Sequence, residues 1–434
     1  MRRTHVLLAG AACVAGIALA HGGGSASAER PVAAEIEARS IAPAEEVASY
    51  AALAEAPSPS PSPSPVAKPG LDLDRIVRVG DHYEVPMAGG KVAILTLDPT
   101  LQEAAEQLLV ESRAPKGAIV AMAPDGKILA LAGRRATEPK GSIDGTFDPH
   151  LATDAWAPAA SVFKLVTASA LVGAGVDPDD KIAFHGGVRS VMESNLRDDK
   201  RDSGTASLAF GVAHSNNAIV GKFAFQHLEP ATLTRLAHDM GLDTSYAQIP
   251  GVAGKLALPD THDLEFAKAA AGFVGTDLSA VGGAMLAATF ADDGEQPTPY
   301  LVDKLVGGAD PAAHPLRRVV TADVARAVTK MMVQTCDIGS AARSFHNHKI
   351  RVAGKTGTLT RTEPFYMEHS WFVGYAPVDK PTIVVSVVLG NPENWHLRGQ
   401  EAARRLIDQA LGANRREKDR AAKIASQRDK RNQW

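Results

Sequence analysis

An unbroken alternation of proline and serine from Pro57 to Pro65 divides this chain of 434 residues into two unequal parts. Proline fixes φ and has no backbone N–H, so neither a helix nor a central strand can continue through such a stretch. We therefore expect an extended, semi-rigid spacer here. The shorter part of the chain precedes the spacer, and the part long enough to fold follows it.

Residues 1–28 have the pattern of an export segment. Arg2 and Arg3 precede an apolar run over residues 6–20, and small residues near the end of the segment offer cleavage sites. The run is shorter than the roughly 20 residues of an ordinary membrane-spanning helix. The segment is either a cleaved signal peptide or an uncleaved anchor. Both predict a protein of the periplasm or cell envelope, secreted or held to the inner membrane through residues 6–20.

Residues 29–90 are predicted to be a disordered linker, in which an Ala/Glu-rich stretch with little to bury leads into the Pro-Ser spacer. The chain as a whole has the composition of a soluble globular protein, with 45% hydrophobic and 22% charged residues. Its net charge of −3 excludes a protein-wide basic surface for nucleic acid. Two cysteines, Cys13 and Cys336, are too few for a disulfide framework.

Strand patterns lie at both ends of the foldable part, and helical patterns lie between them. Strands are expected at 92–97, 117–122, 128–131, 350–353, 370–375 and 382–389, and the first helix at 101–110. We predict an α+β fold, in which an antiparallel sheet built from N- and C-terminal strands is flanked by helices and carries an all-helical subdomain. The predicted domain spans 91–412, and a basic tail follows at 413–434.

The first candidate catalytic pair is Ser161 and Lys164, which open an apolar stretch that ends at Gly173. A helix that is apolar on every side is a buried helix, and two residues three apart on its first turn share one face. Burial favours the neutral form of lysine, and a neutral amine can take a proton from a serine hydroxyl. Ser-x-x-Lys taken alone also fits a capping serine and an exposed lysine.

Two later motifs are weaker when each is taken alone. Ser215 and Asn217 precede an apolar helix, where such residues are ordinary N-caps, but they also offer a hydroxyl and an amide. In the run Lys355-Thr356-Gly357-Thr358, a lysine and two hydroxyls can bind a carboxylate, and glycine lets a ligand backbone approach closely. The simpler interpretation of this run is a hairpin end with a surface lysine.

Together and in this order, the three motifs resemble the signature of penicillin-binding proteins and serine β-lactamases. Two further segments support the resemblance. Thr96 to Gln102 is similar to the start of the transpeptidase domain of bifunctional penicillin-binding proteins, and Trp371 to Pro377 is similar to the strand after the family's third motif. The resemblance covers residues 91–412 and implies the fold of the β-lactamases and transpeptidases.

The resemblance also implies the roles of the motif residues. Ser161 attacks a D-alanyl-D-alanine peptide bond or a β-lactam and forms an acyl-enzyme, and Lys164 accepts its proton. Ser215 and Lys164 then relay a proton to the leaving amine. Asn217 binds the substrate amide and helps to hold Lys164. The remaining implied roles are carboxylate binding by Lys355, Thr356 and Thr358, close approach of the substrate at Gly357, and an oxyanion hole made by the backbone N–H groups of Ser161 and Thr358.

The implied substrates are peptidoglycan stem peptides, and the implied inhibitors are β-lactams. No cofactor is expected, and no metal, because His346 and His348 lack matching acidic or cysteine ligands. Linker and signal fill roughly the first 70 residues and leave no room for a glycosyltransferase domain, so a separate glycosyltransferase is the expected partner.

Three functions remain open at this point. The first is an exported D,D-transpeptidase, the second a hydrolase (a D,D-carboxypeptidase or serine β-lactamase), and the third a non-catalytic β-lactam-binding scaffold or sensor. The deacylating glutamate of class A lactamases has only a superficial match in Glu229, and a carbamylated Lys164 of the class D type stays open. The intact set of motif residues argues against the scaffold. We therefore favour the transpeptidase.

Overall fold

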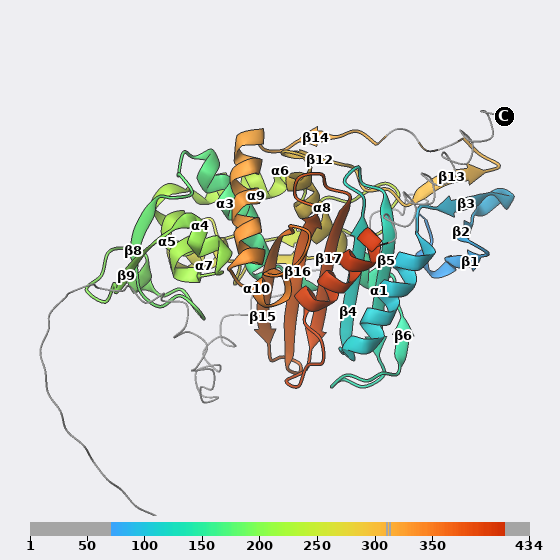
Figure 1. Cartoon of the computed structure of the whole chain (residues 1–434), viewed down its shortest axis with the longest axis horizontal. Coiled ribbons are helices and arrows are strands. Elements are labelled where there is room, and N and C mark those ends of the chain that lie inside the picture. The colour runs from blue at the N-terminus through green and yellow to red at the C-terminus, as the bar shows by residue number, and fades with distance from the viewer. Residues whose placement is uncertain (1–70, 310, 312–313, 413–434) are drawn as a thin grey trace, which may run out of the picture. The chain divides into compact units, whose positions relative to one another are not determined.

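A computed structural model describes residues 71–309, 311 and 314–412 (Figure 1). The export segment expected at 1–28 and the basic tail expected at 413–434 lie outside these residues, as does the linker up to residue 70. Within the described ranges, no helix combines the length and the apolar character that a membrane crossing requires.

The centre of the fold is a six-stranded sheet with the order β15-β16-β17-β4-β5-β6, in which every pair is antiparallel. Its strands are β4 (Lys116–Met122), β5 (Ile128–Ala136), β6 (Gly145–Phe147), β15 (Ala353–Arg361), β16 (Met367–Ala376) and β17 (Ile383–Asn391). The two ends of the chain meet where β17 pairs with β4. The predicted antiparallel sheet of N- and C-terminal strands is confirmed.

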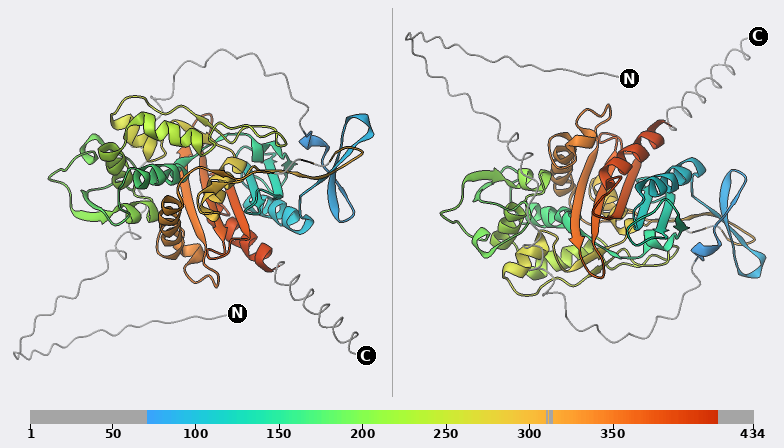
Figure 2. Two further views of the ribbon diagram at one scale, coloured as in Figure 1. Left: turned by 90° about the horizontal axis from the view of Figure 1, so that it is seen from above. Right: turned by 90° about the horizontal axis from the view of Figure 1, so that it is seen from below.

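Both faces of this sheet are covered by helices (Figure 2). Along β4, Ile119 packs into the core beneath α1 (Pro99–Ser112) and the helix at 399–412. Its neighbour Val120 packs into the opposite core, which contains α8 (Ala280–Ala291). Strands that are buried on both faces have continuous apolar sequences rather than alternating ones, which is the pattern seen here.

A helical part lies beside the β15 edge of the sheet (Figure 1). It contains α3 (Lys164–Gly173), α4 (Leu208–Ala213), α5 (Asn217–His227), α6 (Pro230–Asp239) and α7 (Leu264–Ala270). The helix α9 (Ala322–Asp337) packs against both α4 and β15 and so connects this part to the sheet. A hairpin of β8 (Lys181–Phe184) and β9 (Gly204–Ser207) accompanies the helices, a detail that the predicted all-helical subdomain did not include.

The expected linker is wrong over residues 71–90. These residues contain β1 (Val77–Val79) and β2 (His82–Pro86), which join β3 (Val92–Leu95) and β13 (Val302–Val306) in a second sheet of order β1-β2-β3-β13. Tyr83 and Val85 alternate with polar neighbours and are buried, so this short strand has an apolar face. That face belongs to the same core cluster as Leu71, Leu73 and Leu95. The strand β3 lies in this second sheet rather than in the central one, and it pairs there with β13, far along the chain.

The remaining elements are short. They are α2 (His150–Thr153), α10 (Ala342–Phe345), β7 (Ala157–Pro158), β10 (Gly254–Leu256), β11 (Thr276–Leu278), β12 (Glu295–Gln296), β14 (Arg317–Arg318) and the 3₁₀ turns η4 (Leu73–Arg75), η5 (Ala88–Gly90), η6 (Ala160–Phe163) and η7 (Glu193–Asn195). Among these, η6 matters most for function, because it carries Ser161. This turn leads directly into α3, which begins at Lys164.

Candidate active site

The three sequence motifs meet where β15 faces the helical part. Ser161 lies on η6, Ser215 lies in the turn between α4 and α5, and Lys355 lies on β15. Hydrogen bonds join the motifs in pairs. Lys164 contacts Asn217 of the second motif over 2.7 Å, and Lys355 contacts Ser215 over 3.0 Å. The fold thus brings together residues that are widely separated in the sequence.

The first motif places a buried amine beside a partly exposed hydroxyl. Lys164 Nζ lies 2.7 Å from Ser161 Oγ, and Lys164 is completely buried whereas Ser161 is not. The same Nζ donates to Asn217 Oδ1 and to the carbonyl oxygen of Ala271, each over 2.7 Å. The predicted helical turn is present, although its first residues form a 3₁₀ turn.

The environment of Lys164 favours the neutral amine. Burial lowers the pKa of Lys164 well below its ordinary value, and the positive charge of Lys355 lowers it further. A neutral amine has two N–H bonds and one lone pair. Two carbonyl oxygens, of Asn217 and Ala271, occupy the two N–H bonds, so the lone pair is left facing the hydroxyl of Ser161.

The backbone before Ser161 adopts an uncommon conformation. Ala160 has φ of 50°, in the left-handed region, which costs an alanine about 1–2 kcal/mol. Its carbonyl group lies against the bare backbone of Gly272, where a Cβ atom would come within 2.0 Å of Ala160 O. Because Gly272 follows Ala271, one short segment both fits against Ala160 and supplies an acceptor for Lys164.

The second motif, Ser215-Asn216-Asn217, lies in the turn before α5, and its middle residue is the N-cap of that helix. Asn216 caps α5, since its Oδ1 accepts from the Ile219 N–H over 3.1 Å. Ser215 has φ of 58° and accepts a hydrogen bond from Lys355 Nζ. The resemblance implied a relay between Ser215 and Lys164, whereas the hydrogen bond in the structure joins Ser215 to Lys355.

The third motif lies on β15, which starts at Ala353 rather than at residue 350. Lys355 is fully buried, donates to the Thr356 carbonyl over 2.9 Å, and has a pKa that burial lowers to about 7. The Thr356 hydroxyl lies 2.5 Å from that of Ser340, and Thr358 is exposed. All four predicted residues of this motif therefore lie on β15, an edge strand of the central sheet.

Gly357 lies where β15 packs closely against η6. A Cβ atom at this position would lie 3.2 Å from the Val162 side chain and 3.2 Å from Trp371 Cβ. Trp371 in turn donates from Nε1 to the Pro158 carbonyl over 2.8 Å. The segment that carries Ser161 is thus packed closely onto the strand that carries Lys355, and a side chain at position 357 would require its neighbours to shift by a few tenths of an ångström.

A family model described as the penicillin-binding protein transpeptidase domain matches residues 117–411 of this chain. The chain belongs to this family. The matched range lies inside the predicted range of 91–412 and contains every motif residue described above. This match confirms the predicted family, and the structure confirms the predicted α+β fold.

Proteins of known name and solved structures are similar to this chain in sequence or in fold. The peptidoglycan D,D-transpeptidase PbpA of Mycobacterium tuberculosis is 26% identical over 338 residues, which cover 70% of this chain and 68% of that protein. The D,D-transpeptidase domain of a peptidoglycan glycosyltransferase from Eggerthella lenta has a TM-score of 0.61 and 25% identity, covering 76% of this chain and 85% of that one. Penicillin-binding protein A of M. tuberculosis, solved as an imipenem acyl-enzyme complex, has a TM-score of 0.59 and 23% identity, with coverages of 73% and 79%.

Some groups of this transpeptidase site were missed by the sequence analysis. The carbonyl oxygen of Ala271 holds Lys164, and the carbonyl oxygen of Val188 accepts from Asn217 Nδ2 over 3.0 Å. Backbone carbonyls have no sequence signal, because every residue has one. Ser340 follows the end of α9 and belongs to no motif, so only its contact with Thr356 identifies it.

Residues that the sequence analysis set aside lie in ordinary structural positions. Glu229 is the exposed N-cap residue of α6, and Cys336 is a buried free thiol whose pKa burial raises. His348 pairs with Asp408 over 2.7 Å. Among the described residues, no three His, Cys, Asp or Glu side chains are grouped so that they could hold a metal ion.

Proposed function

We propose that this protein is an exported serine-type D,D-transpeptidase that crosslinks peptidoglycan stem peptides through an acyl-enzyme on Ser161. The observation that carries the proposal is the position of Lys164 Nζ. It lies 2.7 Å from the Ser161 hydroxyl, with its N–H bonds directed at two carbonyl oxygens. PbpA, the similar protein of M. tuberculosis, is named a peptidoglycan D,D-transpeptidase.

In the first step, Ser161 Oγ attacks the carbonyl carbon of the D-alanyl-D-alanine bond. As the Oγ–C bond forms, the hydroxyl proton moves to the lone pair of Lys164, which becomes an ammonium. Asn217 Oδ1 and Ala271 O stabilise that ammonium, because both lie 2.7 Å from Nζ. Proton transfer of this kind typically contributes about 10²–10⁴ in rate.

The developing oxyanion is held by the backbone N–H groups of Ser161 and Thr358. One such donor is typically worth about 10²–10³ in rate. The terminal carboxylate of the donor peptide binds to Lys355 with the hydroxyls of Thr356 and Thr358. A carboxylate next to Lys355 favours its charged form, so substrate binding counteracts the burial that lowers its pKa to about 7.

Collapse of the tetrahedral intermediate breaks the C–N bond and releases D-alanine. The leaving amine needs a proton, which the Ser215 hydroxyl donates. In this proposal the Lys164 ammonium returns a proton to Ser215 once the substrate is bound, although in the free enzyme Ser215 contacts Lys355. Lys355 orients this hydroxyl, because its Nζ donates to Ser215 Oγ and leaves the hydroxyl proton free for transfer. An ester between Ser161 and the donor peptide remains, and Lys164 is neutral again.

The second half of the reaction distinguishes a transpeptidase from a hydrolase. An amine of a neighbouring stem peptide attacks the ester, loses its proton to Lys164, and regenerates Ser161. In the described part of the chain, Lys164 Nζ has three hydrogen-bond partners, and none is a carboxylate that would activate water. Glu229 is exposed at the start of α6. These observations favour the amine as acceptor and a slow reaction with water.

The proposed substrate also determines where the protein acts and what it acts with. Peptidoglycan is assembled outside the cytoplasm, which agrees with the export pattern of residues 1–28. The glycan strands come from a separate glycosyltransferase in this proposal. The chain then acts in the periplasm or cell envelope, either secreted or anchored through residues 6–20.

A donor–acceptor assay tests the proposed reaction. The protein is incubated with a peptide ending in D-alanyl-D-alanine and with an amine acceptor, and the products are separated by mass. The aminolysis product, formed by the wild type and absent with Ser161→Ala, is the expected result. A hydrolysed peptide alone identifies a carboxypeptidase. Rapid turnover of benzylpenicillin identifies a β-lactamase, and no reaction with either compound identifies a scaffold.

A further inference from the structure

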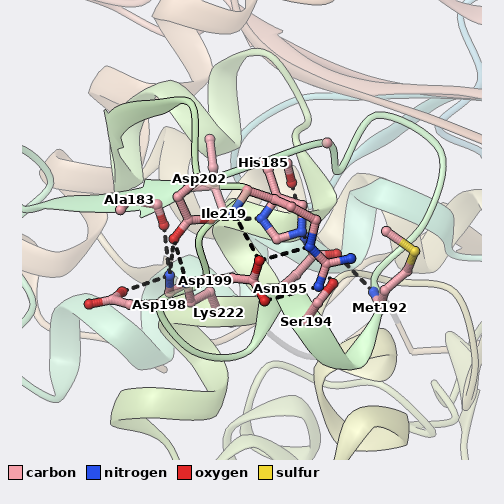
Figure 3. Close-up of polar contacts among 12 residues, drawn as sticks. Ala183, His185, Met192, Ser194, Asn195, Asp198, Asp199, Asp202, Ile219 and Lys222 are labelled. Carbon is pink, nitrogen blue, oxygen red and sulfur yellow. Dashed lines mark hydrogen bonds and ion pairs between the residues drawn. The ribbon is translucent and has the colours of Figure 1, made fainter.

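A buried cluster of Lys222, Asp202 and His185 lies in the helical part, outside the three motifs (Figure 3). Lys222 of α5 is only 1% exposed in its side chain, and Asp202 and His185 are 9% and 10% exposed. Removing an ammonium from water is unfavourable unless it is paired and hydrogen-bonded. No step of the proposed reaction uses these side chains directly, so their burial calls for another explanation.

The cluster ties the β8–β9 hairpin to α5. Lys222 Nζ lies 3.4 Å from the buried Asp202 Oδ2 and 2.9 Å from Oδ1 of the exposed Asp198, and it donates to the Ala183 carbonyl over 2.8 Å. The other oxygen of Asp202 lies 2.7 Å from His185 Nδ1, and the second ring nitrogen of His185 lies 3.2 Å from Ser194 Oγ. Asp202 therefore bridges the helix and the residue that directly follows β8.

The loop after His185 holds the second motif. The carbonyl of Gly186 accepts from Asn216 Nδ2 over 3.0 Å, and that of Gly187 accepts from the Asn217 N–H over 2.7 Å. The carbonyl of Val188 accepts from Asn217 Nδ2 over 3.0 Å. Three consecutive carbonyl groups thus fix Asn216 and Asn217.

The contact with Val188 determines which atom of the Asn217 amide faces the reacting centre. Because Val188 O accepts from Nδ2, Oδ1 is the atom that points at Lys164. If the loop moves, the amide is free to rotate and to present its NH₂ group to Lys164 instead. The amine then loses an acceptor for one N–H bond, and its lone pair is no longer directed at Ser161.

We propose that the His185–Asp202–Lys222 cluster positions Asn217, and through it Lys164, for acylation. Lys222 and Asn217 lie on the same helix, five residues or about 7.5 Å apart along its axis. The cluster thus acts on Asn217 from two directions, through α5 and through the 186–188 loop. The inference rests on the proposed function, and all three members of the cluster are positioning residues.

The test compares variants of the full chain in their reaction with benzylpenicillin. Asp202→Asn keeps the shape of the central side chain and removes its charge, and Lys222→Met removes the amine. Arg201→Ala is the matched control. Its side chain is about half exposed in the same loop and pairs with Asp199 rather than with the cluster. Thermal unfolding of each variant shows that it is folded, and Asp202→Asn serves as the test if Lys222→Met unfolds.

The positioning role predicts a specific kinetic pattern. A misplacement of about 1 Å in a reacting group can cost about 100-fold in rate, so the acylation rate constant at saturating penicillin should fall about tenfold or more in both cluster variants. The dissociation constant of the non-covalent penicillin complex should stay within about twofold of the wild type, because the cluster does not touch the ligand. Arg201→Ala should acylate like the wild type.

A second substitution separates positioning from general destabilisation. In an Asn217→Ala background, Asp202→Asn should slow acylation by less than about twofold, since the side chain through which it acts is gone. Equal slowing in both backgrounds overturns the inference, and so does wild-type acylation in both cluster variants. A wild-type protein that forms no penicillin adduct overturns the proposed function instead, so the two failures are distinguishable.

Discussion

Lys355 donates a hydrogen bond from Nζ to Ser215 Oγ over 3.0 Å, which joins β15 to the turn between α4 and α5. This hydrogen bond connects the second motif to the third. A hydroxyl that accepts from Lys355 has its own proton available for donation. Ser215 is therefore oriented to give a proton to the leaving amine, while Lys355 stays at the same place to attract the substrate carboxylate.

Replacement of Ser215 by alanine should remove the proton path to the leaving group and leave the nucleophile in place. We expect Ser215→Ala to slow acylation by a D-alanyl-D-alanine peptide by about 10²–10⁴-fold, the usual contribution of a positioned proton donor. Rapid-quench mass spectrometry of the acyl-enzyme measures the rate. An acylation rate within about threefold of the wild type would show that the proton travels by another route.

The rate of acylation by penicillin should pass through a maximum as the pH is varied. Lys164 must be neutral to accept a proton, so the rate falls as the pH drops through its lowered pKa. Lys355 must be charged to bind the carboxylate, so the rate also falls as the pH rises through about 7. The second-order acylation constant reports both groups in the free enzyme.

Lys355→Arg is the variant that tests the alkaline side of this profile. A guanidinium keeps its charge across the whole accessible range, so the fall above pH 7 should disappear, even though the altered geometry lowers the maximum rate. If the alkaline fall persists at the same pH in Lys355→Arg, then Lys355 is not the group responsible for it.

Lys164→Arg distinguishes a proton acceptor from a mere positive charge at the same position. Arginine does not lose its proton in proteins, so it cannot take the proton of Ser161. The acylation rate should drop by at least about 10²-fold at every pH between 6 and 9. A variant that retains acylation would mean that the hydroxyl proton leaves through another group.

Gly272 should tolerate no side chain. Its φ of 90° is in the left-handed region, and a Cβ atom there would meet Ala160 O at 2.0 Å. Gly272→Ala should destabilise the protein by about 2 kcal/mol or more and slow acylation, because the backbone on both sides of Ser161 must shift.

Gly173→Ala is the matched control for this substitution. Nothing lies within 4 Å of a Cβ atom at Gly173, the last residue of α3. Replacing a helical glycine by alanine should be neutral or stabilise by up to about 1 kcal/mol. Thermal unfolding compares the two variants, and equal melting temperatures would contradict the steric argument.

The sequence was most informative where the interactions are local or where burial leaves a clear pattern. Ser161 and Lys164 lie one turn apart on the same chain segment, so their proximity follows from spacing alone. The central strands β4 and β17 are buried on both faces and have continuous apolar sequences, so they could be located without a structure.

The remainder depends on contacts between distant segments. The strands within residues 71–90 are short, and the sheet that they join is completed by β13, more than 200 residues later. The hydrogen bond between Ser215 and Lys355 spans 140 residues, and the Ala271 carbonyl that holds Lys164 belongs to no motif. Such pairings are set by tertiary packing, which local propensity and periodicity do not encode.

The most direct test of Ser161 as the nucleophile of a transpeptidase is the intact mass of the purified protein after incubation with benzylpenicillin, with Ser161→Ala beside it. We expect the wild type to gain the mass of one penicillin in an adduct that lasts many minutes, and Ser161→Ala to gain none. An adduct that disappears within seconds while penicillin is consumed would contradict the assignment as a transpeptidase. An adduct that persists on Ser161→Ala would contradict Ser161 as the nucleophile.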